Sequence, residues 1–321
     1  MSVFVMFAFG VGCCLLLVRL VTSYLRLSNI PGPLAAKFTD LWCYKLQNSK
    51  AYSSRLVELH NNTCDPAAIP IIYSINPTWI KGPSYYGAIP VSKNRPVPSI
   101  IGMGEAQYTA VRKSVGRAFT TNSLLDYEDS IEATGKELIA VLSHETETDI
   151  GEWLQYFAMD MLIRISFGDS LGMLSKRQDV DGTLQAVMAR FDHWGQWGAV
   201  PSIDYAVNKS RLATTLRGVR DHPLARVAQS KLDTRKRDEN KSSYRDLCSK
   251  FLEGQKKYPQ LVKQDEILGI IISTIGAGAD TTVSTLTYTL YFLSKHPAAR
   301  QKLIDEINEN LSQGTLSRTP K

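Results

Sequence analysis

The sequence predicts a mainly α-helical protein that begins with a membrane anchor. Apolar residues recur at helical spacing through most of the chain after residue 47, no stretch of four or more residues alternates as a strand does, and residues 1–18 carry no charged side chain. The chain has 321 residues and no internal repeat. We therefore expect an anchor over residues 1–25, a linker over 26–47 and one helical domain over 48–321.

The N-terminal apolar run is long enough to cross a membrane, because a helix rising 1.5 Å per residue spans about 27 Å over 18 residues. Arg19, Arg26 and Lys37 follow this run, and basic residues favour the cytosolic side of a membrane. Neither a basic stretch before the run nor a small-residue cleavage site after it indicates a cleaved signal peptide. A single-pass protein with most of its chain in the cytosol is predicted.

Capping residues and prolines divide the rest of the chain into helices. Thr121 to Ser123 offers side chains that cap the start of a helix, and Pro297 separates the two helices nearest the C-terminal end. Pro201 and Pro223 break the middle of the chain. The expected helices cover residues 51–60, 105–119, about 121–144, 267–293 and a stretch that begins at residue 297.

Composition excludes several classes of function. The formal net charge is +6, but the basic residues are spread through the chain without interleaved aromatic residues, so a base-stacking nucleic-acid surface is not predicted. The five cysteines form no C-x-x-C pair and no Cys/His cluster with zinc spacing, and their odd number gives no sign of a disulfide framework. We interpret all five as structural.

The most informative motif is Ala277-Gly-Ala-Asp280-Thr281-Thr, because Asp280 is the only charged residue between Ile267 and Leu293. A buried carboxylate is costly unless it is paired or used, and glycine weakens a helix interior by about 0.5–1 kcal/mol. Helical spacing places the following residues on one face, with Asp280 beside it: Thr274, Gly278, Thr281 and Thr285. Two interpretations stay open: a functional notch, or small residues for close packing with hydroxyls bonded to the preceding turn.

This motif resembles the oxygen-activation motif of the cytochrome P450 haem-thiolate monooxygenases, and the chain is most similar to their fungal microsomal type. Further landmarks follow in that family's order, from a proline hinge to the helix after the central one. They are Pro31-Gly-Pro33, Tyr108 to Arg112, Asp149 to Trp153 through Phe167-Gly168, Trp194 to Tyr205, and Lys295 to Glu306. The fold implied is the N-terminal part of a cytochrome P450 domain behind a membrane anchor.

The resemblance implies a haem (heme) cofactor and roles for six residues. Arg112, with Tyr108 one turn before it, is expected to hold a haem propionate, and Ala277 and Gly278 to lie against the haem. Asp280 and Thr281 are expected to relay protons to bound dioxygen. The resemblance also implies electrons from an NADPH-cytochrome reductase, a small lipophilic substrate, the endoplasmic reticulum membrane and a place in fungal secondary-metabolite biosynthesis.

The sequence departs from the family pattern in two places. Family members continue through a Glu-x-x-Arg helix and a Phe-x-x-Gly loop that carries the cysteine ligand of the iron, and neither stretch occurs in these 321 residues. Only four residues separate His60 from Asp65, where the family has a turn and a two-stranded hairpin. No metal ligand is therefore predicted in this chain, and we expect it not to catalyse oxidation as printed.

Two further functions remain open at this point. One is a non-catalytic remnant that cannot bind haem. The other is a two-span membrane protein in which residues 267–293 cross the membrane with a functional Asp280. Eight Ser and Thr residues between Ser273 and Thr289 make that stretch a poor lipid-facing helix.

Overall fold

The fold was analysed in a computed structural model that describes residues 2–63, 65–74, 79–89, 91–92, 95–97, 99–218, 222–237 and 245–315. Almost every described element is helical, which confirms the mainly α fold class. Contacts divide the chain into two units, Met1–Ala88 with Phe191–Arg217 and Ile89–Arg190 with Gly218–Lys321. The boundary between the units falls inside one helix, α11 (Thr183–Trp197).

The first unit joins the N-terminal helices to a later stretch of the chain. It contains the second half of α11 and the elements α1 (Ser2–Leu27), α2 (Leu34–Phe38), α3 (Leu41–Gln47), α4 (Tyr52–Thr63), α5 (Ala68–Ile72), the 3-10 helix η1 (Pro83–Ala88), α12 (Pro201–Asp204), the π-helix η5 (Tyr205–Lys209) and α13 (Arg211–Leu216). Helix α4 extends to Thr63, three residues beyond the expected end at residue 60, so the short connection before Asp65 is partly helical.

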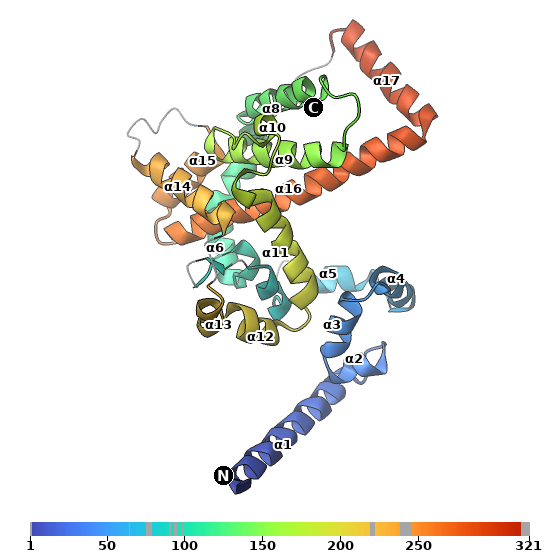
Figure 1. Ribbon diagram of the computed structural model, residues 1–321, viewed down its shortest axis with the longest axis vertical. Coiled ribbons are helices and arrows are strands. Elements are labelled where there is room, and N and C mark those ends of the chain that lie inside the picture. The colour runs from blue at the N-terminus through green and yellow to red at the C-terminus, as the bar shows by residue number, and fades with distance from the viewer. Residues whose placement is uncertain are drawn as a thin grey trace. The chain divides into compact units, whose positions relative to one another are not determined.

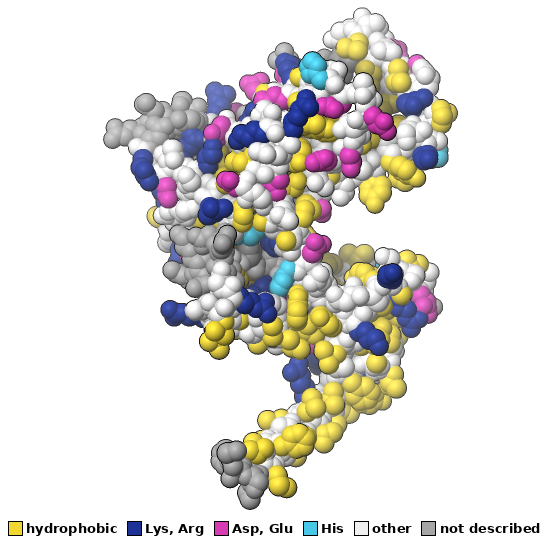
Figure 2. Space-filling view, in the orientation of Figure 1, with side chains coloured by type: hydrophobic (Ala, Val, Ile, Leu, Met, Phe, Trp, Pro, Cys, Tyr) yellow, Lys and Arg dark blue, Asp and Glu magenta, His cyan; other side chains and the backbone are white. Residues whose placement is uncertain are grey.

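Helix α1 exposes apolar side chains along its length, which appear as a yellow rod in Figure 2. Its stretch Val5–Leu27 is long and apolar enough to cross a membrane, and none of that stretch is buried. Helix α16 (Gln264–Lys295) passes the same test of length and composition, but half of it is buried inside the second unit. That burial is typical of a core helix, so α1 is the better candidate for a membrane anchor.

The second unit holds most of the buried apolar residues. Besides the first half of α11 it contains β1 (Val91–Ser92), β2 (Arg95–Pro96), η2 (Ile100–Gly102), α6 (Glu105–Val115), η3 (Gly116–Phe119), α7 (Thr121–Leu125), α8 (Glu128–Leu142), α9 (Ile150–Phe167), α10 (Met173–Lys176), η4 (Val180–Gly182), α14 (Pro223–Arg237), α15 (Leu247–Lys257), α16 and α17 (Pro297–Ser312). Strands β1 and β2 pair antiparallel, Val91 with Pro96 and Ser92 with Arg95. Two-residue strands are too short to show alternation in the sequence.

The core of this unit is the contact between α9 and α16, which lie side by side in Figure 1. Ala158, Met159 and Ile163 of α9 are fully buried, as are Ile271 and Ile275 of α16. Burying side chains of this size contributes about 1.5–3 kcal/mol each, so this contact fixes the first half of α16. Beyond it, α16 emerges from the core and leads into α17, whose described residues are almost all exposed.

The helix expected from about residue 121 to 144 is wrong as a single element. Helix α7 ends at Leu125 and α8 begins at Glu128. Between them the Tyr127 hydroxyl donates to the Ala118 carbonyl at 3.1 Å, and Lys250 Nζ donates to Asp126 at 2.6 Å. These contacts come from residues distant in sequence or earlier in the chain, so local capping signals could not reveal the break.

Candidate functional site

The predicted motif lies where α16 passes from the core to the surface. Ile271, Ile275 and Ala279 are buried, whereas Ala277 and Thr281 are exposed. The exposed positions continue one and two turns later at Ser284 and Tyr288, which is the spacing of one helix face. We call the set Ala277, Thr281, Ser284 and Tyr288 the exposed stripe of α16.

The glycines of the motif face neighbouring helices and do not open a notch. A Cβ added at Gly278 would lie 3.0 Å from both Cδ atoms of Leu162 in α9, and one at Gly276 would lie 3.6 Å from Nη1 of Arg190 in α11. Gly278 therefore permits close approach of α9, as the structural interpretation of the motif predicts. Of the four residues expected on one face, Thr281 and Thr285 are exposed, while Thr274 and Gly278 are half-buried.

The threonine hydroxyls bond back along the helix. Thr281 Oγ1 donates to the Ala277 carbonyl at 2.9 Å, Thr285 Oγ1 to the Thr281 carbonyl at 2.9 Å, and Thr289 Oγ1 to the Thr285 carbonyl at 2.8 Å. Each oxygen keeps its lone pairs free to accept a further hydrogen bond. The Thr281 hydroxyl can thus accept a hydrogen bond from a group bound against the exposed stripe while it keeps its own bond to the Ala277 carbonyl.

Asp280 lies beside the exposed stripe and is half-buried. Within the described residues its carboxylate makes no side-chain hydrogen bond and no ion pair. Packing against Leu162 accounts for Gly278 but gives no reason for the carboxylate at Asp280. The functional interpretation of Asp280 and Thr281 therefore stays a prediction.

Tyr108 and Arg112 form a pair on α6. Arg112 Nη1 donates to the Tyr108 hydroxyl at 2.8 Å, and its guanidinium carbon lies 6.0 Å from the centre of the Tyr108 ring. Arg112 is exposed and lies within ion-pair distance of no carboxylate in the described parts of the chain. The tyrosine restrains a guanidinium whose charge is not neutralised, which is an arrangement suited to binding a carboxylate ligand.

Polar contacts connect the region around α6 to the first half of α16. The Gln107 side-chain amide donates to the Glu266 carboxylate, and the hydroxyls of Ser99 and Ser273 lie 3.0 Å apart in a buried position. Both candidate groups, Arg112 and the exposed stripe, therefore belong to one unit. The sequence contained no signal for these contacts, because each joins residues more than 150 positions apart.

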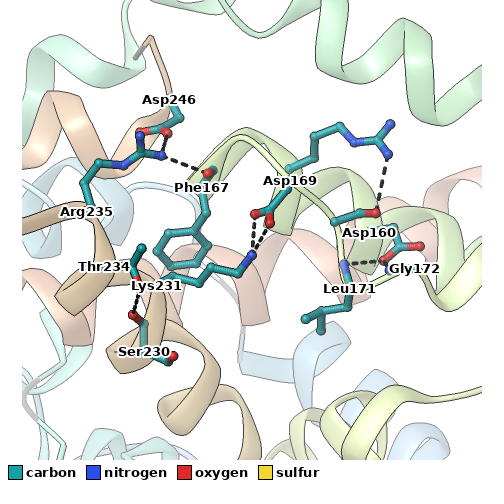
Figure 3. Close-up of polar contacts among 12 residues, drawn as sticks. Asp160, Phe167, Asp169, Leu171, Gly172, Ser230, Lys231, Thr234, Arg235 and Asp246 are labelled. Atoms are coloured by element: carbon teal, nitrogen blue, oxygen red, sulfur yellow. Dashed lines mark hydrogen bonds and ion pairs between the residues drawn. The ribbon is translucent and has the colours of Figure 1, made fainter. Parts of the chain in front are cut away.

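Helix α9, which supports Gly278, is itself held by buried charges at its C-terminal end (Figure 3). The fully buried Asp160 carboxylate accepts hydrogen bonds from the backbone N–H groups of Leu171 (3.1 Å), Gly172 (3.0 Å) and Leu174 (3.0 Å). Arg235 pairs with Asp246 and donates to the Phe167 carbonyl at 2.9 Å. The sequence analysis missed these supports, although an acid inside the apolar stretch of residues 153–167 is a usable signal.

Burial disfavours the metal-binding thiolate form of the two described cysteines outside α1. Burial, followed by the charge of Asp246, raises the pKa of the fully buried Cys248 to about 12. Burial also raises the pKa of Cys43, with Asp40 adding to the effect. Cys13 and Cys14 lie exposed on α1, and Cys64 is outside the described residues. In the described ranges no three His, Cys, Asp or Glu side chains could hold a metal ion together.

Comparison with known proteins identifies the family. The family model described as Cytochrome P450 matches residues 100–319, which is more than half of the chain. A "Cytochrome P450 monooxygenase" of Aspergillus terreus is 26% identical over 94% of this chain and 66% of its own length. The proteins named easK in Aspergillus fumigatus (29% identical, 96% of this chain, 69% of the relative) and vrtE in Penicillium aethiopicum (26%, 92% and 60%) carry the same description.

The chain thus spans about 60–69% of the length of these three relatives. The matched residues include Tyr108, Arg112 and the whole motif from Ala277 to Thr282, whose geometry is described above. The matched region also contains the contact between α9 and α16. This chain belongs to the cytochrome P450 family.

Proposed function

We propose that this chain is part of a haem-dependent monooxygenase, in which α16 supplies the oxygen-side residues and α6 holds a cofactor carboxylate. The observation that carries the proposal is the exposed stripe of α16, where Thr281 lies beside a half-buried Asp280 without a described partner. The relatives support it, since each is named a cytochrome P450 monooxygenase.

The described residues are suited to contact one face of a haem and a propionate at its edge. The exposed stripe begins with Ala277, whose methyl group leaves room for a flat ring, and Arg112 offers a restrained, unneutralised guanidinium for a propionate. No described cysteine is assigned as the thiolate iron ligand that this family uses, because burial disfavours the thiolate of Cys43 and Cys248, and Cys13 and Cys14 lie on α1, the candidate membrane anchor. We assign Arg112, Tyr108, Ala277 and Thr281 to haem contact and assign no iron ligand.

Haem, when bound, supplies the oxidation of the substrate by dioxygen. The protein's part is to hold and move protons beside it. Thr281 would release the Ala277 carbonyl and donate its hydroxyl proton to an acceptor bound against the exposed stripe, and Asp280 would pass a proton from solvent back to Thr281. Gly278 contributes indirectly, because its contact with Leu162 sets how closely this turn of α16 packs against α9.

The Thr281 role is tested in a protein that contains this chain and carries haem. The change Thr281→Ala should uncouple oxygen consumption from product formation by about tenfold or more, since a proton donor in the reacting position contributes about 10²–10⁴-fold. Thr285→Ala is the matched control, because Thr285 makes the same backbone bond one turn later. Equal coupling in the Thr281→Ala variant and the native protein would contradict the assignment.

Electrons are proposed to come from an acidic flavoprotein reductase that docks on α6 and α15. The basic side chains Lys113 and Lys257 both lie over the Tyr258 ring, with Nζ 6.0 Å and 5.5 Å from its centre. The two helices touch where Gly254 meets the Ser114 carbonyl, so a Cβ at residue 254 would not fit. Like charges held around one ring favour an oppositely charged partner.

This docking surface makes a separate prediction. Lys256→Glu with Lys257→Glu should weaken binding of an acidic flavoprotein at least tenfold at low salt, measured by surface plasmon resonance with the chain in lipid nanodiscs. Lys302→Glu on the exposed face of α17 is the control, because it changes net charge away from α15. If Lys302→Glu weakens binding as much as the double variant does, net charge and not the α15 surface governs the interaction.

The remaining assignments follow from the anchor and the relatives. We propose that α1 holds the chain in the endoplasmic reticulum membrane with most of it in the cytosol, and that substrates are small and lipophilic. A role in fungal secondary-metabolite biosynthesis is part of the same proposal. The non-catalytic alternative keeps one observation in its favour, namely the raised pKa of the Cys43 and Cys248 thiols, and the haem spectrum described in the Discussion decides between the two.

A further inference from the structure

A cluster of buried polar side chains lies in the first unit, outside the haem site. The Asp204 side chain at the end of α12 is 2% exposed and sits at its centre. His193 Nε2 lies 2.7 Å from Asp204 Oδ1, Asn208 Nδ2 donates to the same oxygen at 2.9 Å, and Lys209 Nζ lies 3.2 Å from Oδ2. Three side chains, one from α11 and two from the π-helix η5, thus converge on one carboxylate.

Lys209 extends this cluster to a distant part of the sequence. Its ammonium donates to the backbone carbonyls of Tyr86 at 2.6 Å and Gly87 at 2.8 Å, in η1. The side chain of Lys209 is 9% exposed, so its bonds to Asp204 and η1 form away from bulk water, where screening is weak. The lysine therefore joins residues more than 120 positions apart in the chain.

The π-helix η5 gives Lys209 its direction. Ser210 N–H donates to the Tyr205 carbonyl at 2.6 Å, which is the i to i+5 bond of a π-helix. In an α-helix, residues five apart point about 140° away from each other, so Lys209 and Asn208 could not both reach Asp204. The wider turn brings both side chains onto the carboxylate, and such turns occur frequently at functional positions.

Trp194 of α11 also contacts η1. Its indole N–H donates to the Ser84 carbonyl at 3.1 Å, and its ring lies 6.3 Å from the Tyr85 ring. A Cβ at Gly87 would lie 2.9 Å from Trp194 Cδ1, so a larger residue would not fit beneath the indole. Trp194 thus adds a second contact between α11 and η1, and all of these residues belong to the first unit.

We infer that Asp204 and Lys209 are positioning residues that latch residues 193–209 onto η1, so that these two stretches open and close as one body. Removing the Lys209 charge takes the ammonium away from the buried Asp204 carboxylate and leaves the η1 carbonyls without that donor, which favours separation of the two stretches. The latch explains why residues 191–217 belong with the N-terminal 88 residues, although α11 continues into the second unit.

The inference does not depend on haem, because Thr281, Arg112 and the other residues assigned to the haem lie in the second unit. The full 321-residue chain in lipid nanodiscs can therefore be tested directly by hydrogen exchange with mass spectrometry. Lys209→Met should raise amide exchange at least tenfold in peptides covering both residues 83–89 and residues 201–212. Exchange in the α9 and α16 core, residues 154–163 and 267–275, should not change.

Lys231→Met is the matched control, because Lys231 pairs with Asp169 in the second unit (Figure 3). It should leave exchange at residues 83–89 and 201–212 as in the native chain. Faster exchange confined to residues 201–212, or no change at residues 83–89, would overturn the latch.

A second variant keeps the test decisive if Lys209→Met fails to fold. The double change Asp204→Asn and Lys209→Met removes both charges and leaves no unpaired buried ion. With the core peptides still protected, joint loss of protection in the two stretches supports the latch, and native-like protection in both contradicts it.

Discussion

At the scale of single residues, Gly278 shows how one position can carry two interpretations until a neighbour is known. Its place in the motif predicted a notch, but a side chain there would meet Leu162 of α9 at 3.0 Å. The neighbour lies 116 positions earlier in the chain, so no local pattern could reveal it. Asp280 and Thr281 remain candidate residues, and their catalytic role stays a prediction.

This close contact should reduce the stability gained by Gly278→Ala. Alanine gains up to about 1 kcal/mol in helix propensity, but the Leu162 methyl groups must move aside for the new Cβ, so the change should stabilise the fold less than a glycine-to-alanine change without such a contact. Gly135→Ala in α8 is the control, because a Cβ there meets nothing within 4 Å and only the propensity gain applies. Urea denaturation followed by circular dichroism measures both, and equal stabilisation by the two changes would contradict the contact.

At the scale of elements, the long central helix and the proline that follows it were predictable from the sequence. The break between α7 and α8 and the π-helix η5 were not. Residues 267–293 were expected to be helical and lie within α16, because a long apolar stretch with a following proline is a strong local signal. The split between α7 and α8 depends on Lys250 and Ala118, and the π-helix η5 depends on the cluster around Asp204. Contacts of this kind are tertiary, so propensity could not show them.

The latch has a pH dependence whose sign follows from Asp204. Burial alone would raise the pKa of Asp204, but the hydrogen bonds from His193 and Asn208 and the charge of Lys209 together hold it below its usual value. A carboxyl group with a lowered folded-state pKa stabilises the fold above its unfolded pKa of about 3.9, and that contribution is lost as the pH falls through the lower folded value.

The latch between residues 193–209 and η1 should therefore stay closed from neutral pH down to about pH 4 and open only below it. Fluorescence of Trp194, with the other four tryptophans replaced by phenylalanine, reports this contact because the Trp194 indole bonds to Ser84 of η1. The same titration in an Asp204→Asn background should lose this transition. A transition of equal size and midpoint in that background would assign the titration to another group.

At the scale of the whole molecule, family membership was accessible from sequence because its motifs are local and occur in a fixed order. The division into two units was not, since its boundary falls inside α11, where no linker or change in composition marks it. The second half of α16 leaves apolar side chains such as Tyr288, Tyr291 and Phe292 uncovered. We therefore expect the proposed haem surface of this chain to act together with further polypeptide.

The central claim is that this chain provides the oxygen side and the propionate arginine of a haem site but not the iron ligand. The most direct test is the reduced carbon monoxide difference spectrum of membranes, made for this chain alone and for this chain joined to the part of the Aspergillus fumigatus relative that follows the matched region.

We predict no Soret band of thiolate-ligated haem from the chain alone and a clear band from the joined protein. Arg112→Ala should lower that band several-fold, while Arg117→Ala, another exposed arginine on the adjoining η3, should not. A band from the chain alone would mean that one of its own cysteines ligates the iron. A joined protein whose band is indifferent to Arg112 would contradict the assigned haem contact.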